Sequence, residues 1–139
     1  MSLAHHASRG ALRHQGARFT ARPIGTSISL HVVEGEIDAS NASSLYDFVE
    51  HHLDSTKRLI LDLRGLTFFG TQGFSALHRI NVACSRHGVN LVVLPSDEVN
   101  RLLRICDPAG GLPVARSLQG AIRNAVRPPR THLRLVEHG

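Results

Sequence analysis

The chain has 139 residues, of which 42% are hydrophobic and 19% are charged, and this composition fits a single globular domain. No apolar run approaches the ~20 residues that a membrane-spanning helix requires, the N-terminus lacks the apolar centre of a signal peptide, and two cysteines do not make a disulfide framework. We therefore expect a soluble cytoplasmic protein that does not bind a membrane.

The formal net charge of +5 is concentrated at the two ends of the chain. Residues 1–22 contain four arginines and no acidic residue, whereas residues 23–122 contain ten acidic and eight basic side chains. A domain that binds nucleic acid carries its basic residues on a folded face, together with aromatic side chains that stack on bases. The mildly acidic centre therefore argues against direct binding of nucleic acid.

Three segments follow from the pattern along the chain. Residues 1–17 and 128–139 lack apolar periodicity and are rich in arginine and histidine, so we expect a disordered basic N-terminal tail and a C-terminal tail. Residues 18–127 carry the periodic apolar positions and are predicted to form the folded domain.

The domain is predicted to begin with two strands and a helix. The first strand covers residues 18–22, and a turn follows at 23–26. Apolar and polar residues then alternate, which predicts a half-buried strand over residues 28–37. An apolar stripe from Ala42 to Leu53 predicts a helix, and its candidate N-cap residues are Asp38, Ser40 and Asn41.

The middle of the chain predicts a parallel βαβ unit. Leu59–Leu63 is a nearly continuous apolar run of strand length, and Asn90–Leu94 is a second short buried strand. Between them, residues 70–73 are predicted as a four-residue loop, and apolar residues at helical spacing follow over 72–87. Parallel pairing with a right-handed crossover is the usual arrangement of such a unit.

The last part of the domain adds two further helices. Ser96 and the acidic residues after it open a helix that ends near Asp107, and Ser117 caps a final helix that ends before residues 128–129, which are both proline. Residues 112–115 are a possible edge strand. The whole pattern predicts an α/β sandwich in which about four helices cover a mixed sheet of four or five strands.

The middle segment resembles the signature segment of STAS domains, the anti-sigma factor antagonist family. The likeness rests on a strand with an internal Asp62, the bridge Leu66–Phe69, a loop ending in Gly73 and the apolar helix after it. Upstream, residues 35–38 read Gly-Glu-Ile-Asp and are similar to the family's Gly-acidic-aliphatic-Asp element. The resemblance extends over about residues 18 to 127 and implies the STAS fold.

The resemblance also implies a function and a site. The family loop usually reads Asp-Ser-Ser/Thr-Gly, so that Gly70 stands for the Asp, Thr71 for the phosphorylated Ser and Gln72 for the next hydroxyl residue. The family implies an anti-sigma factor partner with a histidine-kinase-like ATPase fold, which phosphorylates the loop hydroxyl and is then released. The implied switch loop and partner-binding residues are Phe69, Gly70, Thr71, Gln72, Gly73, Phe74, Asp38, Ser40 and Asn41.

Two other roles of this loop remain open from the residues alone. Thr71 lies at the predicted start of a helix, where its hydroxyl can serve as a simple N-cap instead of a phosphoacceptor. The loop and helix N-terminus can also hold the phosphate of a small ligand or nucleotide, which would make the protein a sensor. A third possibility is a scaffold in a signalling complex that is not phosphorylated.

Catalysis finds little support in the sequence. The chain contains no Cys-x-x-Cys, His-Glu-x-x-His or Gly-x-Ser-x-Gly motif, and its ten histidines are scattered. Asp38 and Asp62 are predicted near the same end of the sheet, where they cap loops more readily than they form an acid/base pair. Cys84 and Cys106 are predicted to pack in the core, with a reversible disulfide as the alternative. We expect no enzymatic activity, cofactor or metal.

Overall fold

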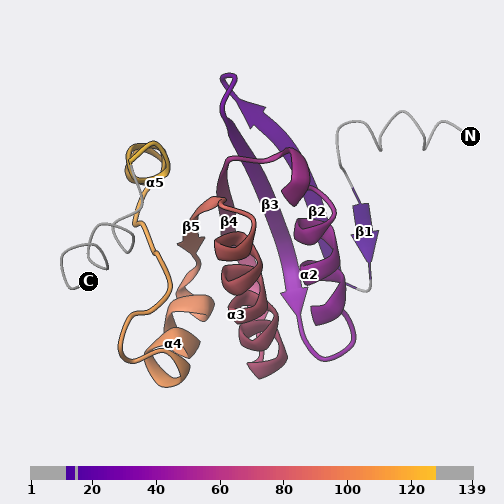
Figure 1. The fold of residues 1–139 in the computed structure, drawn as a ribbon. Coiled ribbons are helices and arrows are strands. Elements are labelled where there is room, and N and C mark those ends of the chain that lie inside the picture. Colours follow the sequence, from indigo (N-terminus) through magenta and orange to yellow (C-terminus); the bar gives the residue numbers. More distant parts are fainter. Residues whose placement is uncertain (1–11, 15, 128–139) are drawn as a thin grey trace, which may run out of the picture.

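Five strands form one mixed sheet in the order β1-β2-β3-β4-β5 in the computed structural model, which describes residues 12–14 and 16–127 (Figure 1). The strands are β1 (Leu12–His14), β2 (Ala17–Ile24), β3 (Ile28–Ile37), β4 (Arg58–Phe69) and β5 (Asn90–Pro95). The helices of the described part are α2 (Ala42–Glu50), α3 (Thr71–Arg86), α4 (Asp97–Cys106) and α5 (Leu118–Ala125), with a short 3-10 turn η1 (Leu53–Ser55).

The strand directions follow from the connections. Tight turns join β1 to β2 and β2 to β3, and both pairs are antiparallel. The crossovers through α2 and α3 make β3, β4 and β5 parallel, as the sequence predicted for β4 and β5. The predicted α/β sandwich with a mixed sheet of four or five strands and about four helices is therefore confirmed.

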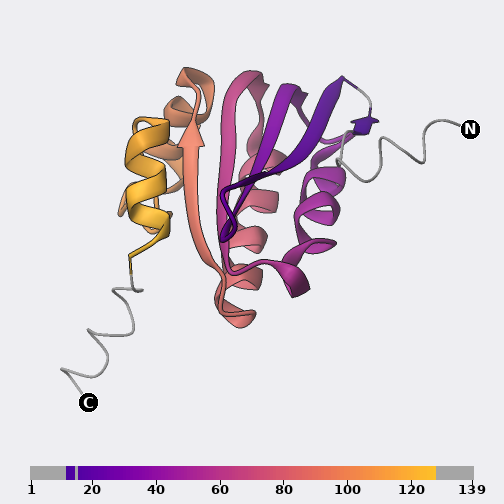
Figure 2. The same cartoon turned by 90° about the horizontal axis from the view of Figure 1, so that it is seen from above.

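Helices cover both faces of the sheet. Helices α2 and α3 pack against one face, where the larger core lies, and α4 contributes Val99 and Leu103 to the same core. Helix α5 covers a smaller core on the opposite face through Ala121 and Ala125. Figure 2 shows α5 beside β5, which is the edge strand opposite β1.

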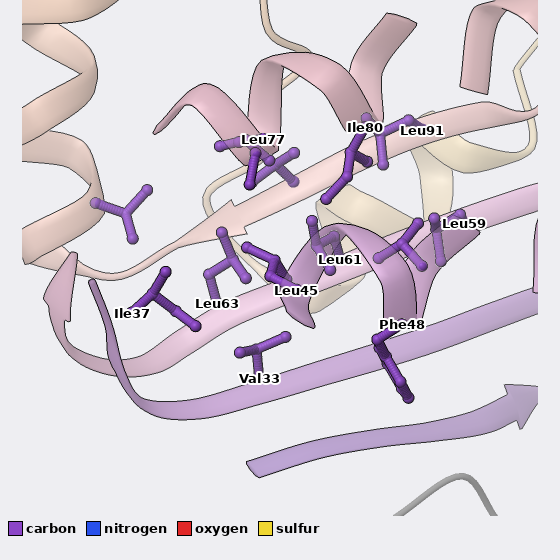
Figure 3. Close-up of a cluster of buried hydrophobic side chains, with 14 of the residues drawn as sticks. Val33, Ile37, Leu45, Phe48, Leu59, Leu61, Leu63, Leu77, Ile80 and Leu91 are labelled. Atoms are coloured by element: carbon purple, nitrogen blue, oxygen red, sulfur yellow. The ribbon is translucent and has the colours of Figure 1, made fainter. Parts of the chain in front are cut away.

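Large aliphatic side chains fill the space between the sheet and the two central helices (Figure 3). Helix α2 contributes Leu45 and Phe48, and α3 contributes Leu77 and Ile80. The strands meet them with side chains that are almost fully buried, namely Val33, Ile37, Leu59, Leu61, Leu63 and Leu91. Burial of this size is the main favourable term that holds α2 and α3 in position.

Strand β4 is longer than the apolar run predicts. It continues past Leu63 to Phe69 because β3 extends beside it, through register shifts between Val32 and Glu34 and between Gly35 and Glu36. Gly65 lies in this irregular part, where an added Cβ would come within 2.9 Å of the Glu34 Cγ. Because glycine has no side chain, Gly65 interrupts the apolar pattern, and the sequence therefore predicts a strand that is too short.

The N-terminal boundary of the sheet also differs from the prediction. Residues 12–14 form β1, and Ala17, which begins β2, is only 2% exposed. The Glu36 backbone N–H donates to the Gly16 carbonyl at 3.0 Å, so this segment is bonded to β3 as well. The expectation of disorder is wrong for residues 12–14 and 17, while residues 1–11 and 128–139 lie outside the described residues.

The possible edge strand at residues 112–115 reduces to an isolated bridge. Val93 donates to the Pro113 carbonyl at 2.8 Å and accepts from the Ala115 N–H at 2.9 Å. Proline has no backbone N–H and cannot continue a ladder, which explains why the pairing stops there.

Candidate functional site

The ends of β3 and β4 bring two loops together at one edge of the sheet. The two strands are parallel, and Ile37 at the end of β3 pairs with Phe69 at the end of β4. The Gly70 N–H donates to the Ile37 carbonyl at 3.0 Å, which ties the start of α3 to the segment that leads into α2. Both helices begin at this edge, at the bottom of Figure 1.

Helix α3 begins one residue after β4. Gly70 is the N-cap residue and Thr71 is the first helical residue, so α3 begins one residue before the predicted helix 72–87, and residues 71–73 of the predicted loop belong to its first turn. The Phe74 N–H already donates to the Gly70 carbonyl at 3.2 Å. The helix starts early because its first turn packs directly on the end of the sheet, which the apolar spacing does not reveal.

The Thr71 hydroxyl does not cap the helix. It lies 3.3 Å from the Gln72 Oε1, and no side chain caps the N-terminus of α3. A hydroxyl caps from the N-cap position, and Thr71 lies one residue too late to do so. The N-capping role is therefore wrong, and an exposed hydroxyl remains beside the first backbone N–H groups of a helix whose first turn carries no acidic residue.

Gly73 allows α3 to approach the sheet closely. A Cβ on Gly73 would lie 2.6 Å from the Phe69 Cε1 and 3.0 Å from the Ile37 Cγ2, distances that real Cβ atoms do not tolerate without movement. The glycine therefore presses the first turn of α3 against the ends of both β3 and β4, and this contact fixes the position of Thr71.

Gly70 is under no such constraint. Its φ of −90° is open to any residue, and an added Cβ would meet the Phe68 ring at 3.4 Å, an ordinary contact. The backbone therefore accommodates the Asp that the related loops carry at this position, although this chain has glycine there.

The loop between β3 and α2 is held by its own polar side chains. The Asp38 Oδ1 accepts from the Ser40 N–H at 2.9 Å and from the Ser40 hydroxyl at 2.6 Å. These hydrogen bonds from Ser40 lower the pKa of the Asp38 carboxyl. The Asn41 Oδ1 accepts from the Asp38 N–H, and its Nδ2 donates to the Glu36 carbonyl, both at 2.9 Å. Asp38 thus stabilises a loop, as the sequence predicted.

The residues implied by the family resemblance divide by exposure. Thr71, Gln72 and Ser40 are exposed, and Asp38, Gly70 and Phe74 are half-buried. The remaining three are buried, namely Phe69, Gly73 and Asn41. These three residues pack or form hydrogen bonds beneath the surface of this edge.

Sequence reasoning missed an exposed aromatic at the same edge. Phe68 is 47% exposed, pairs in register with Glu36, and lies against Gly70. Adjacent residues of a strand point to opposite faces, so the pair Phe68 and Phe69 already implied that one ring is outside the core. On the neighbouring helices, the Arg79 guanidinium lies 4.0 Å over the Tyr46 ring.

Asp62 does not belong to this site. It lies in the middle of β4, where it pairs in register with Val32, and it forms a two-pronged ion pair with Arg64 at 2.9 Å. The hydrogen bonds that the Arg64 guanidinium donates to Asp62 raise its pKa. The expectation that Asp38 and Asp62 lie near the same end of the sheet is therefore wrong, since Asp38 follows the end of β3.

The two cysteines lie apart from this edge and are both free thiols. Cys84 is buried in the main core, where burial raises the pKa of its thiol to about 12. Cys106 is half-buried at the end of α4. Among residues 12–14 and 16–127, no three His, Cys, Asp or Glu side chains are grouped to hold a metal ion, and no helix is long and apolar enough to cross a membrane.

The fold is that of a known domain family. The STAS domain model matches residues 24–121, and the chain therefore belongs to the STAS family. Over 101 residues the chain is 29% identical to the anti-sigma-F factor antagonist RsfA of Mycobacterium tuberculosis, an alignment that covers 70% of this chain and 78% of the relative.

Solved structures share the same fold. An anti-sigma factor antagonist from Mycobacterium paratuberculosis superposes with a TM-score of 0.71 at 19% identity, covering 80% of this chain and 95% of that one. SpoIIAA in its unphosphorylated form superposes with a TM-score of 0.62 at 15% identity, covering 78% and 99%. At these identities the likeness establishes the fold.

Proposed function

We propose that this protein is an anti-sigma factor antagonist, which binds an anti-sigma factor and thereby frees a sigma factor for transcription. Its membership of the STAS family and its similarity to RsfA, whose name states that activity, support the proposal. The anti-sigma factor partner is a kinase-type protein with a histidine-kinase-like ATPase fold. Binding takes place in the cytoplasm, without contact to nucleic acid or membrane, and the antagonist itself turns over no substrate.

The partner binds at the edge where α2 and α3 begin. We define the switch surface as the exposed or half-buried residues at this edge, namely Asp38, Ser40, Phe68, Gly70, Thr71, Gln72 and Phe74. The Phe68 ring supplies apolar area, and the polar residues around it supply hydrogen bonds, a combination typical of protein interfaces. The buried residues Asn41, Phe69 and Gly73 hold this surface in shape.

The Thr71 hydroxyl is the phosphoacceptor of the switch surface. The observation that carries the proposal is that Thr71 is exposed and is the first residue of α3. In the transfer, the Thr71 Oγ1 forms a bond to the γ-phosphorus of the ATP held by the partner, ADP leaves, and the hydroxyl proton passes to a base of the partner. The phosphate then lies at the positive end of α3, beside backbone N–H groups that have no helical partner.

The phosphate opposes binding through charge. It adds about two negative charges to a surface that already contains Asp38, whose carboxyl is ionised at neutral pH. Burying this charge against the partner costs desolvation and repulsion energy, and each 1.4 kcal/mol lowers the affinity about tenfold. SpoIIAA, a structural relative, is known in both an unphosphorylated and a phosphorylated form, which supports a switch of this kind.

Intact-mass analysis tests the acceptor. The purified protein is incubated with a candidate anti-sigma factor of the same organism and ATP. We expect one added phosphate on the wild type and on Ser75→Ala, which removes another exposed hydroxyl of α3, and none on Thr71→Val. A phosphate that persists in Thr71→Val would disprove the assignment.

Titration calorimetry with the same partner tests the switch. We expect Thr71→Glu to weaken binding at least tenfold, while Gln119→Glu, which adds the same charge on exposed α5, leaves it unchanged. Equal binding of the wild type and Thr71→Glu, with no phosphate on Thr71, would favour a scaffold that is not phosphorylated.

The structure offers less support for a ligand sensor at this loop. Two cavities lie in the described part of the chain, one beside the start of β5 and one beside the β2–β3 hairpin, and neither is lined by residues 70–73. We therefore do not place a ligand at this loop.

A further inference from the structure

A second polar site lies at the opposite edge of the sheet from the switch surface. A cavity of about 410 Å³ is lined by the β2–β3 hairpin and by the connection from α2 to β4, both at the top of Figure 1. Ser29 at the start of β3 pairs with Leu59 at the start of β4, so the two segments adjoin. The cavity adjoins the start of β4 and Thr71 follows its end, so the length of this 12-residue strand, roughly 40 Å at about 3.3 Å per residue, separates the two sites.

The cavity is lined by three cations and no acid. Arg22, Lys57 and Arg58 face it, and no Asp or Glu is among its lining residues. Among the residues that the structure describes, the ion pairs involve none of these three side chains. Like charges gathered without partners repel one another, and such an arrangement is stabilised when an anion neutralises it.

Hydroxyl groups complete the lining. Thr26, Ser27 and Ser29 line the cavity from the hairpin, and no hydrogen bond of their side chains to another described residue is present. On the other wall, the Ser55 and Thr56 hydroxyls donate to the His52 carbonyl at 3.3 and 2.6 Å, so the three hairpin hydroxyls are the donors left for a ligand. Cations and free hydroxyl donors together are the groups that bind phosphate oxygens.

We propose that this cavity binds a small organic molecule that carries a diphosphate. The three cations match the two to three negative charges of that group, and the volume lies in the range of small-molecule sites, about 300–1,000 Å³. Ala21, Pro23 and Ile28 supply apolar contacts for the organic part. The site is separate from the switch surface, so its occupation does not block the anti-sigma factor.

Calorimetric titration of the full-length protein at low salt tests the site. The probes are ADP and inorganic pyrophosphate, with adenosine as the probe without phosphate and sodium sulfate at equal ionic strength as the salt control. We expect ADP and pyrophosphate to bind and adenosine and sulfate not to bind. Tighter binding of ADP than of pyrophosphate shows that the organic part contributes, and equal binding of adenosine overturns the proposal.

Matched charge variants locate the binding. We expect Arg22→Gln with Lys57→Gln to weaken ADP binding at least tenfold, and Ser27→Glu, which keeps all three cations, to do the same. The control pair Arg104→Gln with Arg116→Gln removes the same charge from exposed positions outside the cavity and should leave ADP binding unchanged. Equal weakening by the control pair means a general charge effect and overturns the site.

This result is independent of the switch. All these variants are at exposed positions and should keep the melting temperature of the free protein and the affinity for the anti-sigma factor. Loss of ADP binding with intact partner binding supports a separate site. Failure of partner binding by the wild type would instead concern the function of the switch surface.

Discussion

Two glycines three residues apart do different things at the switch surface. Gly70 has an ordinary backbone conformation and open space for a side chain, whereas Gly73 has the Phe69 ring where its Cβ would lie. Only Gly73 is required by packing. The close contact that Gly73 permits sets the distance between the first turn of α3 and the sheet. It therefore also sets how far the Thr71 hydroxyl lies from the sheet.

Substitution of Gly73 should reverse the usual effect of alanine in a helix. Gly→Ala in a helix interior ordinarily gains about 0.5–1 kcal/mol, but overpacking against the Phe69 ring and Ile37 costs about 1–3 kcal/mol. We therefore expect Gly73→Ala to lower the free energy of unfolding, as measured by urea denaturation. The control Ser75→Ala, at an exposed position of the same helix, should stay within about 0.5 kcal/mol of the wild type. A more stable Gly73→Ala would contradict the packing.

At the scale of single residues, the sequence located the edge but not the exposure of each side chain. The family resemblance pointed to both loops, and the contact between Gly70 and Ile37 brings them together as that resemblance implied. It could not separate Phe68 from Phe69, because which ring enters the core depends on the register shift in β3 and β4. Nor could it reveal that Asn41 bonds inward to the Glu36 carbonyl.

At the scale of the elements, apolar periodicity predicted the helices and the parallel strands well. These are long segments with one buried face, where the pattern is strong. The errors lie where glycine or a short strand interrupts it, as in the extension of β4 past Gly65 and in the three-residue β1. A strand of three residues pairs through its backbone hydrogen bonds, which do not require any particular sequence of side chains. Such a strand therefore has no recognisable sequence pattern.

Shortening the chain tests the contribution of β1. A chain that begins at Arg18 lacks β1, the buried Ala17 and the Gly16 carbonyl that accepts from Glu36. We expect it to fold with unchanged far-UV circular dichroism but to lose about 1–3 kcal/mol of stability, since each lost hydrogen bond contributes about 0.5–1.5 kcal/mol. A chain that begins at Leu12 should match the full-length protein in urea denaturation. Equal stability of the two shortened chains would show that β1 contributes nothing.

At the scale of the whole molecule, one buried side chain of the described residues has polar atoms without hydrogen-bond partners. His31 of β3 is fully buried, and neither of its ring nitrogens has a hydrogen-bond partner among the described residues. Its ring lies 4.9 Å from that of Phe48 and 5.0 Å from that of His52. Burial, and next the charge of His52, lower the pKa of His31 from 6.5 to about 3.

This shift makes global stability depend on pH. Between pH 6.5 and about 3 the unfolded chain protonates His31 and the folded protein does not, so unfolding is favoured as the pH falls. The loss is about 1.4 kcal/mol per pH unit, or about 2 kcal/mol by pH 5. We expect His31→Leu to be more stable than the wild type at pH 5, and to lose less stability than the wild type between pH 7.5 and 5. The control His51→Leu, at an exposed position, should show the pH dependence of the wild type. Parallel pH profiles of His31→Leu and the wild type would contradict the assignment.

The two margins of the sheet bear on how the protein behaves at high concentration. β1 presents only three residues, and on the far side Val93 of β5 is already bonded to Pro113 and Ala115. Long, unpaired strands at the rim of a sheet recruit strands of other molecules and lead to aggregation. β1 covers residues 17–19 of β2, and Pro23, which has no backbone N–H, interrupts the rest of that rim. Both rims therefore give such recruitment little backbone to copy, which favours a protein that stays dispersed.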